Sequence, residues 1–546
     1  MDRIKFQNYK AFESGEIELR PLTLLLGANS SGKSSILHLL LMLEQTINCQ
    51  DNLKSAFKAN GHSVSMGEDI NLLKDMNRQS NMVLEIDVTP SIFISEIKSF
   101  HNLLNQSVML GFMNNLKNNS PKNFKVFERL SREWMEQITK TEDNKSVDIA
   151  KTYLEIVSKE NDNLLSYLLE TEVAKERVRS EWWKKYTVEE LNQMINDLGA
   201  CIKTFEEEFK EVPSFVSLKY VLGYNKTQGK LKVKECSIIV DNRELLAISS
   251  MRNRLTLTSG VYDNVCIERL MGHNTISGIF NGLSLNILND MKSPFEVYIE
   301  KIFNEAFKSA SHFFSETNIN YIGPLRATPQ RYYFLDGSNT ISTFGYRSGE
   351  RIAEILKGSK DIDNMVNEWM MHFGLNVKVK EFKDVIHKIK VRQNSLNLDL
   401  PDVGFGVSQI LPILIDGVLF GDDTTTIMEQ PEIHLHPKMQ AELADFFINV
   451  VKRNNNDTKG TTRRYVIETH SEYIMKRIRR RIAEGMIAPE DVAIYFVEPR
   501  NKKLKKEAKI IRTFVENDGT IEWPEDFYMT ELEDELAFFR SKVSKS

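Results

Sequence analysis

One stretch constrains the fold more than any other, LTLLLGANSSGKSSILHLLL at residues 22–41. Its middle, GANSSGKS at 27–34, matches the pattern G-x-x-x-x-G-K-[ST] in full. In such a loop glycines let backbone N–H groups curl round phosphates, Lys33 reaches the terminal phosphates, and the Ser34 hydroxyl binds Mg²⁺. The apolar run before the loop and the helical spacing of leucines after it predict a buried strand, a phosphate-binding loop, and a helix over 33–47.

Length and composition limit the remaining choices. A chain of 546 residues exceeds one ordinary core and suffices for two or three domains. Its 71 basic residues are balanced by 76 acidic ones, so any contact with DNA or RNA would need a local basic patch. Four widely spaced cysteines without a CxxC pair fit a reducing cytosol. No apolar leader or membrane-length run is found, and we expect a cytoplasmic protein without membrane contact.

Hydrophobic patterning divides the chain into four parts. Residues 1–90 hold strand-like runs and the phosphate loop. Residues 91–213 have apolar residues at three and four spacing and almost no Gly or Pro, which predicts an inserted helical arm. Residues 214–530 form the third part, in which strand-like segments return over 215–258 and helix and strand alternate from 400 to 500, which indicates α/β architecture. Residues 531–546 read as a C-terminal helix and tail.

Three further motifs lie almost 400 residues after the loop. TTTIMEQPEIHLHP at 424–437 reads as a strand ending in acidic residues, where Glu429 would hold the Mg²⁺ shell. RRYVIETHSEYI reads as a strand followed by His470, placed to meet a γ-phosphate. The turn DVGFGVSQILPIL at 402–414 enters an apolar helix, and its small residues would let Ser408 and the backbone approach a phosphate.

The order of these motifs resembles the ABC-type ATPase heads of the RecF/SMC/OLD superfamily. More narrowly, EQPEIHLHP resembles the bacterial AAA-labelled ATPases of Septu-type (PtuA) anti-phage systems, which also occur with some retrons. YIGPLRATPQRYY at 321–333 and GTIEWPEDFY at 519–528 are further matching stretches. The resemblance covers roughly residues 1–90 and 215–530 and not the arm. It implies an α/β, ABC-type (RecF/SMC-like) P-loop ATPase head with an inserted long helical arm.

The same resemblance implies that ATP and Mg²⁺ bind between two heads of a homodimer or higher homo-oligomer, with residues 434–437 at the seam. One head would supply its phosphate loop and the other its Gly-rich turn. The implied nucleotide-binding residues are Gly27, Asn29, Ser31, Gly32, Lys33, Ser34 and Ser35 of the loop, and Gly404, Gly406, Ser408 and Gln409 of the turn. The implied metal residues are Ser34 and Glu429, and the implied catalytic residues are Lys33, Glu429, Gln430, Glu432 and His470.

Gln430 departs from the superfamily pattern. Most such heads read Asp-Glu where this chain reads Glu429-Gln430. A neutral amide cannot accept the proton of the attacking water. Glu432 could substitute, although alternation points it to the side of Gln430 only if the strand continues past Pro431. We therefore expect slow hydrolysis, with bound ATP acting largely as a signal that holds a dimer.

Other features carry less weight. The basic runs at 476–481 and 501–509 are expected to be solvated faces, with phosphate contacts to DNA or RNA as the minority interpretation. Trp182 and Trp183 are expected to pack rather than to stack on bases. A metal cluster beyond Mg²⁺ explains less than the ATPase interpretation does for Glu429, Glu432, His434, His436, His470 and Glu472.

Three functional hypotheses follow. The residues after His470 contain no DxD motif and no acidic glycine loop, so no nuclease domain is expected in this chain. The first hypothesis is a defence ATPase that senses infection or nucleotide state and controls a partner effector, an HNH nuclease by resemblance. The alternative is a RecF/SMC-like DNA-binding ATPase of repair or maintenance. The third is a scaffold whose bound ATP only stabilises a dimer.

Overall fold

The structure is a computed structural model of the chain. It describes residues 3–49, 51–101, 188–251, 254–265, 267–268, 278–287, 294–315, 318–324, 326, 328–334, 352–383, 386–419, 424–455, 463–501, 506–523, 537–538 and 540. The middle of the predicted arm, with Trp182 and Trp183, lies outside the described residues, as does nearly all of the predicted tail over 531–546.

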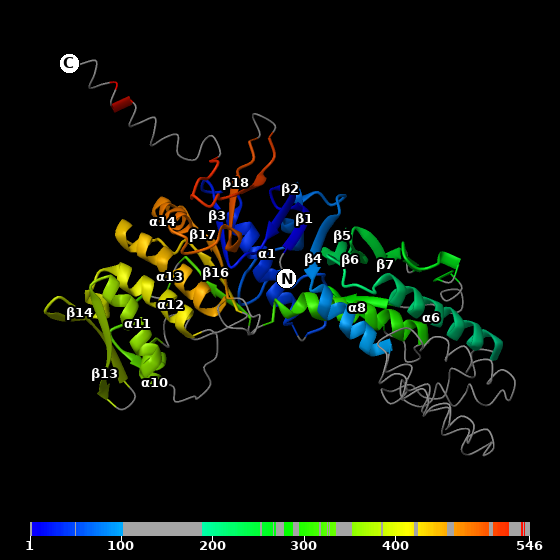
Figure 1. The fold of residues 1–546 in the computed structure, drawn as a ribbon, viewed down its shortest axis with the longest axis horizontal. Helices are drawn as coiled ribbons and strands as arrows, with labels where there is room; N and C mark the ends of the chain where they lie inside the picture. The colour runs from blue at the N-terminus through cyan, green and yellow to red at the C-terminus, as the bar shows by residue number, and fades with distance from the viewer. Residues whose placement is uncertain are drawn as a thin grey trace.

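A six-stranded sheet forms the centre of the molecule (Figure 1). Its order is β11-β16-β17-β3-β18-β19, and every neighbouring pair is parallel except β18 with β19. The strands are β3 (Leu22–Leu26), β11 (Ile319–Ile322), β16 (Thr425–Glu429), β17 (Arg464–Glu468), β18 (Val492–Glu498) and β19 (Lys509–Thr513). Parallel strands end at the same edge of a sheet, so the last residues of β3, β16 and β17 lie close together.

A second sheet of seven antiparallel strands has the order β2-β1-β4-β5-β6-β7-β8. Its strands are β1 (Arg3–Tyr9), β2 (Phe12–Glu18), β4 (Met82–Val88), β5 (Val216–Asn225), β6 (Lys230–Val240), β7 (Arg243–Met251) and β8 (Arg254–Thr258). Val88 pairs with Val216, so the chain leaves this sheet and returns to it at one point. The segment between them is therefore inserted, and its described ends are helical, over 90–101 and in α6 (Val188–Glu208).

Two apolar cores cover the two faces of the central sheet. One lies between that sheet, the seven-stranded sheet, α1 and α8, and the other between the central sheet and the helices α10 to α14. Strand β3 contributes Leu25 to the first core and Leu24 to the second, which is why its sequence is an unbroken apolar run. These helices are α1 (Lys33–Ile47), α8 (Pro294–His312), α10 (Ile352–Gly358), α11 (Lys360–His372), α12 (Phe405–Leu419), α13 (Pro437–Asn455) and α14 (Glu472–Ala483).

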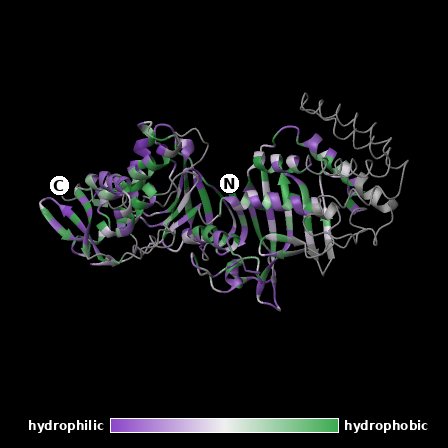
Figure 2. Ribbon diagram, turned by 90° about the horizontal axis from the view of Figure 1, so that it is seen from below, coloured by the Kyte–Doolittle hydropathy of each residue, from purple (hydrophilic) through white to green (hydrophobic). Residues whose placement is uncertain are grey.

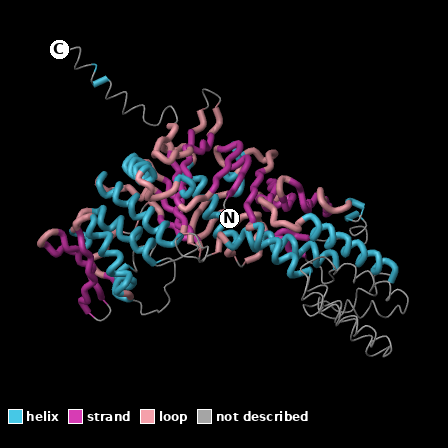
Figure 3. Tube along the Cα trace, viewed as in Figure 1, coloured by secondary structure: helices cyan, strands magenta, loops and turns pink. Residues whose placement is uncertain are grey.

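Coloured by hydropathy, apolar and polar residues are interspersed along the strands and the helices (Figure 2). Helices flank the strand-rich middle of the molecule on both sides (Figure 3). The strand, loop and helix predicted around the GANSSGKS motif are confirmed. None of the described helices combines the length and the apolar character needed to cross a bilayer.

The sequence did not predict a small sheet at the far end of the molecule, beside α10 and α11 (Figure 1). It contains β12 (Tyr333–Phe334), β13 (Leu375–Lys383), β14 (Ile386–Gln393) and β15 (Leu396–Asp399). A separate hairpin joins β9 (Gly278–Asn281) and β10 (Ser284–Ile287). In β13 and β14 Val or Ile alternates with Lys, so one face packs on the helices and the other stays polar.

Candidate functional site

The GANSSGKS loop has the backbone of a phosphate cradle. Gly27, Ser30 and Gly32 have positive φ angles of 143°, 61° and 109°. At Gly27 a Cβ atom would lie 2.4 Å from the carbonyl oxygen of Val497, so only glycine fits there. The Ser31 hydroxyl is buried and has no hydrogen-bond partner within the described structure. An unsatisfied donor inside a glycine-bent loop fits a phosphate ligand.

Lys33 begins α1 and turns back over the loop. Its Nζ donates to the carbonyl oxygens of Gly27 at 3.1 Å and Ala28 at 2.8 Å, and lies 3.7 Å from Oε1 of Glu468. Only 2% of the residue is exposed. Burial lowers the pKa of the Lys33 ammonium, and the Glu468 carboxylate acts in the opposite direction. The lysine is thus a desolvated cation held at the mouth of the loop, where terminal phosphates would lie.

Glu468 is a functional candidate that our sequence reasoning missed. The Ser34 hydroxyl donates to its Oε2 at 2.7 Å, so the predicted Mg²⁺ ligand of the loop touches this carboxylate. Burial raises the pKa of Glu468, opposed by the Ser34 hydrogen bond and the charge of Lys33. The signal was present in VIETHS, where a glutamate ends an apolar strand, because the carboxyl ends of parallel strands lie at one edge of the sheet.

Glu429, the predicted Mg²⁺ residue, pairs with Glu468 in the parallel register of β16 and β17. Its Oε1 accepts a hydrogen bond from the Tyr321 hydroxyl at 2.8 Å and lies 3.3 Å from Nε2 of His38. The YIGPLR stretch therefore contributes directly to the site, since Tyr321 belongs to the neighbouring strand β11. Glu429 is buried at the predicted edge, and its described polar contacts are with other residues than Ser34.

Strand β16 ends at Glu429, so the strand does not continue through Pro431 to Glu432. Gln430 has a positive φ of 44° and its N–H donates to the carbonyl oxygen of Glu468 at 2.8 Å. The turn that follows still brings Glu432 to the site by another route. Its carboxylate accepts from the backbone N–H of His470 at 2.7 Å and from the Thr469 hydroxyl at 2.8 Å.

Arg326 binds the backbone of this turn through its guanidinium group. Its Nη2 donates to the carbonyl oxygens of Glu429 at 3.4 Å and Gln430 at 3.3 Å. Burial lowers the pKa of Arg326 to about 10, opposed by the charge of Glu432. Burial likewise raises the pKa of Glu432. Arg326 therefore holds the backbone of the turn that carries Glu432.

His470 follows β17 and faces the first residues of the loop. Its Nε2 is buried without a hydrogen-bond partner in the described part of the chain. Burial lowers its pKa, and the nearby Lys33 charge lowers it further. A histidine whose pKa lies below the usual value is neutral at pH 7, so Nε2 can hydrogen-bond to a ligand as acceptor or donor according to its tautomer.

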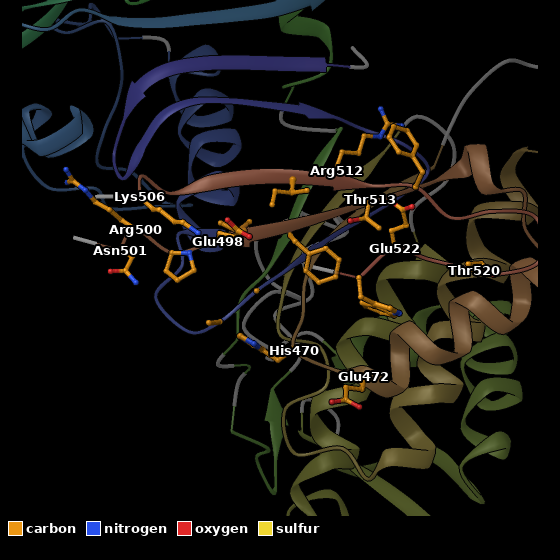
Figure 4. A pocket seen from close by; sticks show the side chains of 18 of the residues that line it. His470, Glu472, Glu498, Arg500, Asn501, Lys506, Arg512, Thr513, Thr520 and Glu522 are labelled. Atoms are coloured by element: carbon orange, nitrogen blue, oxygen red, sulfur yellow. The ribbon is translucent and has the colours of Figure 1, made fainter. Parts of the chain in front are cut away.

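A pocket of about 980 Å³ opens beside His470 (Figure 4). Gly27 and Ala28 form one wall, and the end of β18, strand β19 and the following segment to Trp523 form the others. His470 and Glu472 lie on the side of α14, and Arg512, Thr513 and Glu522 lie across the pocket from them (Figure 4). The start of the phosphate loop is therefore accessible to a large ligand or to a protein segment.

The Gly-rich turn lies at the start of α12, and the structure places its residues unevenly. Ser408 and Gln409 are buried, and the Ser408 hydroxyl donates to the carbonyl oxygen of Phe405 at 2.7 Å. Gly404 and Phe405 are exposed. A Cβ atom on Gly406 would lie 2.6 Å from the carbonyl oxygen of His434, so the turn and the HLHP segment form one surface. Gly404 and Phe405 are thus the exposed part of the turn.

The remaining loop residues are placed as follows. Asn29 is exposed at the tip of the loop, and the N–H of Ser35 donates to the carbonyl oxygen of Gly32 at 3.0 Å.

Among the residues that the structure describes, no group of three or more His, Cys, Asp or Glu side chains is arranged to hold a metal ion. A Mg²⁺ ion at this site would take its other ligands from phosphate oxygens and water.

The basic run 476–481 is paired within the chain. Arg477 and Arg481 both bind the carboxylate of Asp445 on α13, and Arg480 binds Glu484. Arg479 lies over the ring of Trp523, with 5.4 Å between its guanidinium carbon and the ring centroid. Arg477, Arg480 and Arg481 are therefore paired with carboxylates, and the pairs with Asp445 join α14 to α13. Part of the second run, residues 502–505, lies outside the described residues.

A bent glycine loop after a buried parallel strand, with a lysine, a serine and two strand-end carboxylates, defines a P-loop nucleotide-binding protein. The family profile described as AAA ATPase domain matches residues 1–475. The chain therefore belongs to this AAA ATPase domain family, and the expected mixed α/β P-loop ATPase head is confirmed. A comparison with curated proteins finds no match.

Solved structures similar to the chain include several SMC heads. The Smc head bound to the C-winged helix domain of ScpA has a TM-score of 0.34 and 9% identity, over 94% of this chain and 98% of that chain. The SMC head domain from Thermotoga maritima has a TM-score of 0.32 and 8% identity over the same shares. The Smc head with an extended coiled coil from Pyrococcus furiosus, bound to the C-terminal domain of ScpA, has a TM-score of 0.28 and 9% identity over 98% of both chains. At these TM-scores the fold class rests on the sheet topology.

Proposed function

We propose that this protein is an ABC-type ATPase that binds ATP with Mg²⁺ at the edge formed by β3, β16 and β17 and hydrolyses it slowly. The observation that carries the proposal is the meeting of Lys33, Ser34, Glu468 and Glu429 at one edge, from segments more than 390 residues apart in sequence. Mg²⁺ bound there would neutralise charge on the phosphates as the terminal one leaves. The residues of this chain bind and orient those phosphates and the attacking water.

Each residue has a distinct part in this proposal. The loop N–H groups and Lys33 hold the terminal phosphates, and the neutral His470 contacts the last of them from the β17 side. Gln430 can orient water but cannot remove its proton, which limits the rate. Glu432 is held by His470 and Thr469 through both of its oxygens, so it positions His470 instead of acting as a free base.

The site is completed by a second copy of the chain in this proposal. The exposed Gly404 and Phe405 of one head would approach the loop of the other, which gives two nucleotides per head-to-tail dimer. The resemblance of EQPEIHLHP to Septu-type ATPases supports a role in anti-phage defence, where the nucleotide state controls a partner effector such as an HNH nuclease. The alternative role in DNA repair or maintenance receives little support from the run 476–481, in which Arg477, Arg480 and Arg481 are paired with carboxylates of the same chain.

Steady-state turnover and native assembly test this proposal together. Wild type should release phosphate slowly, and Lys33→Ala should abolish that release, whereas the exposed control Lys203→Ala should retain it. Native mass measurement of tagged protein from its own host should find a homo-oligomer with a second, nuclease-containing polypeptide. Turnover that persists in Lys33→Ala would contradict the ATPase assignment. A bare dimer that retains nucleic acid would contradict the effector role and favour the repair-type alternative.

A further inference from the structure

We propose that Glu468, and not the strand-end Glu429 of β16, is the carboxylate that holds Mg²⁺ together with Ser34. This inference rests on the ATP site proposed above and assigns a positioning role within it. Sequence reasoning places this role on the acidic strand of the EQPE motif. The hydrogen bonds of the described structure place it one strand nearer to the phosphate loop.

Direct contact is the first reason. The Ser34 hydroxyl, the loop's own metal ligand, donates to Glu468 at 2.7 Å. Glu429 has its Oε1 engaged by the Tyr321 hydroxyl at 2.8 Å and by Nε2 of His38 at 3.3 Å. Glu429 is thus oriented by two neighbouring side chains, one of them on α1. Glu468 already touches the predicted metal-binding hydroxyl and needs no rearrangement to accept a metal-bound water.

Topology is the second reason. Strand β17 lies between β16 and β3 in the central sheet. The parallel register aligns Glu429 with Glu468 and aligns Glu468 with Leu25, two residues before the loop begins. Neighbouring strands lie about 4.8 Å apart, so Glu429 is one full strand spacing further from the loop strand than Glu468 is.

Charge balance is the third reason. Glu468 and Glu429 are 4% and 7% exposed, and the cation nearest to Glu468 is Lys33 at 3.7 Å. When Lys33 turns toward a phosphate, Glu468 is left as a buried carboxylate without its ammonium partner. Buried charges are retained in proteins when they are paired or coordinate metals, so a divalent cation at Ser34 would replace the lysine. The buried, unpartnered Ser31 hydroxyl independently indicates a ligand in this loop.

The test compares two charge-matched variants, Glu468→Gln and Glu429→Gln, by equilibrium binding of a fluorescent ATP analogue with Mg²⁺ and with EDTA. The measured quantity is the dissociation constant with EDTA divided by the dissociation constant with Mg²⁺. A larger ratio means that Mg²⁺ supports binding more strongly. Both variants remove one negative charge beside the phosphates, so that electrostatic effect is common to both. Glu484→Gln, at the exposed end of α14, serves as the surface control.

We expect Glu468→Gln to reduce this ratio at least tenfold relative to wild type, Glu429→Gln to reduce it clearly less, and Glu468→Asp to restore part of it. Thermal unfolding of each variant checks that the head remains folded. A ratio in Glu468→Gln close to that of wild type, with the loss found in Glu429→Gln instead, would overturn the inference while leaving the ATP site intact. Failure of wild type to bind the analogue under either condition would overturn the proposed function and this inference with it.

Discussion

A buried ion pair ties the Gly-rich helix α12 to the strands that carry the site. Arg463, just before β17, places Nη2 2.6 Å from Oδ2 of Asp416 on α12, and both side chains are 0% exposed. The hydroxyl of Thr426 on β16 donates to the two Asp416 oxygens at 3.0 and 2.9 Å. One network therefore connects the turn at 404–409 with both carboxylate-bearing strands.

Replacing Arg463 with Met should strongly destabilise the head. The substitution leaves Asp416 as a buried carboxylate with Thr426 as its described hydrogen-bond donor. Removing one partner of a buried pair costs about 3–5 kcal/mol, because the remaining charge stays desolvated. At about 2–4 °C per kcal/mol for a large domain, the unfolding midpoint should fall by about 6–20 °C.

Thermal unfolding at pH 7 measures this shift. The control Arg480→Met removes an arginine that is 63% exposed in its pair with Glu484, and it should change the midpoint little. The double variant Asp416→Leu/Arg463→Met removes both charges and should recover most of the loss, because neither partner is left buried alone. A midpoint shift in Arg463→Met no larger than that in Arg480→Met would refute the role of the buried pair. A drop in midpoint of the double variant equal to the summed drops of Asp416→Leu and Arg463→Met would refute it as well.

Three further predictions concern the site itself. Gly27→Ala should lose binding of a fluorescent ATP analogue while the protein stays folded, because the added Cβ would lie 2.4 Å from the Val497 carbonyl oxygen. Binding of the analogue equal to that of wild type would contradict the loop geometry. Gln430→Glu should raise phosphate release at least about tenfold by supplying a base, and an unchanged rate would show that Gln430 does not limit turnover. Burial raises the pKa of Glu432 above its usual 4.5, so the folded state binds this proton more tightly than the unfolded state does. Its stabilising contribution is therefore present below about pH 4.5 and is lost as the pH rises through the folded pKa. The unfolding midpoint of Glu432→Gln should therefore decline less over that pH range than the midpoint of wild type does. Parallel curves of midpoint against pH would argue against the buried carboxylate.

The sequence predicted the local parts of this fold well because their patterns are local. The apolar run of β3 and the leucine spacing of α1 report burial directly, and both elements lie where they were expected. It could not show that β1, β2 and β4 join β5 to β8 in one sheet, because that pairing spans the inserted arm. The alternation of Val or Ile with Lys in β13 and β14 covers few residues, so it could not distinguish a small sheet from a loop.

The sequence predicted the positions of site residues that a motif determines. It missed those whose positions depend on how distant segments pack together. The backbone of the GANSSGKS loop is determined by its glycines, so Lys33 and Ser34 could be placed from the pattern alone. Glu468 lies within the RRYVIETHSEYI motif, where only His470 was given a role, and its contact with Ser34 becomes apparent through the register of β17 against β3. The prediction that Ser408 approaches a phosphate stays a prediction; in the structure its hydroxyl donates to the Phe405 carbonyl oxygen, a contact that residue types alone do not reveal.

Equilibrium binding of ATP in the presence of Mg²⁺ tests the central claim most directly, with wild type, Lys33→Ala and the surface control Lys203→Ala measured side by side. We predict saturable binding of ATP by wild type and by Lys203→Ala, and a loss of at least about tenfold in affinity for Lys33→Ala, whose Nζ lies at the loop carbonyl oxygens beside Glu468. Equal affinity of all three proteins for ATP, or no binding by wild type, would contradict the assignment of this edge as an ATP site.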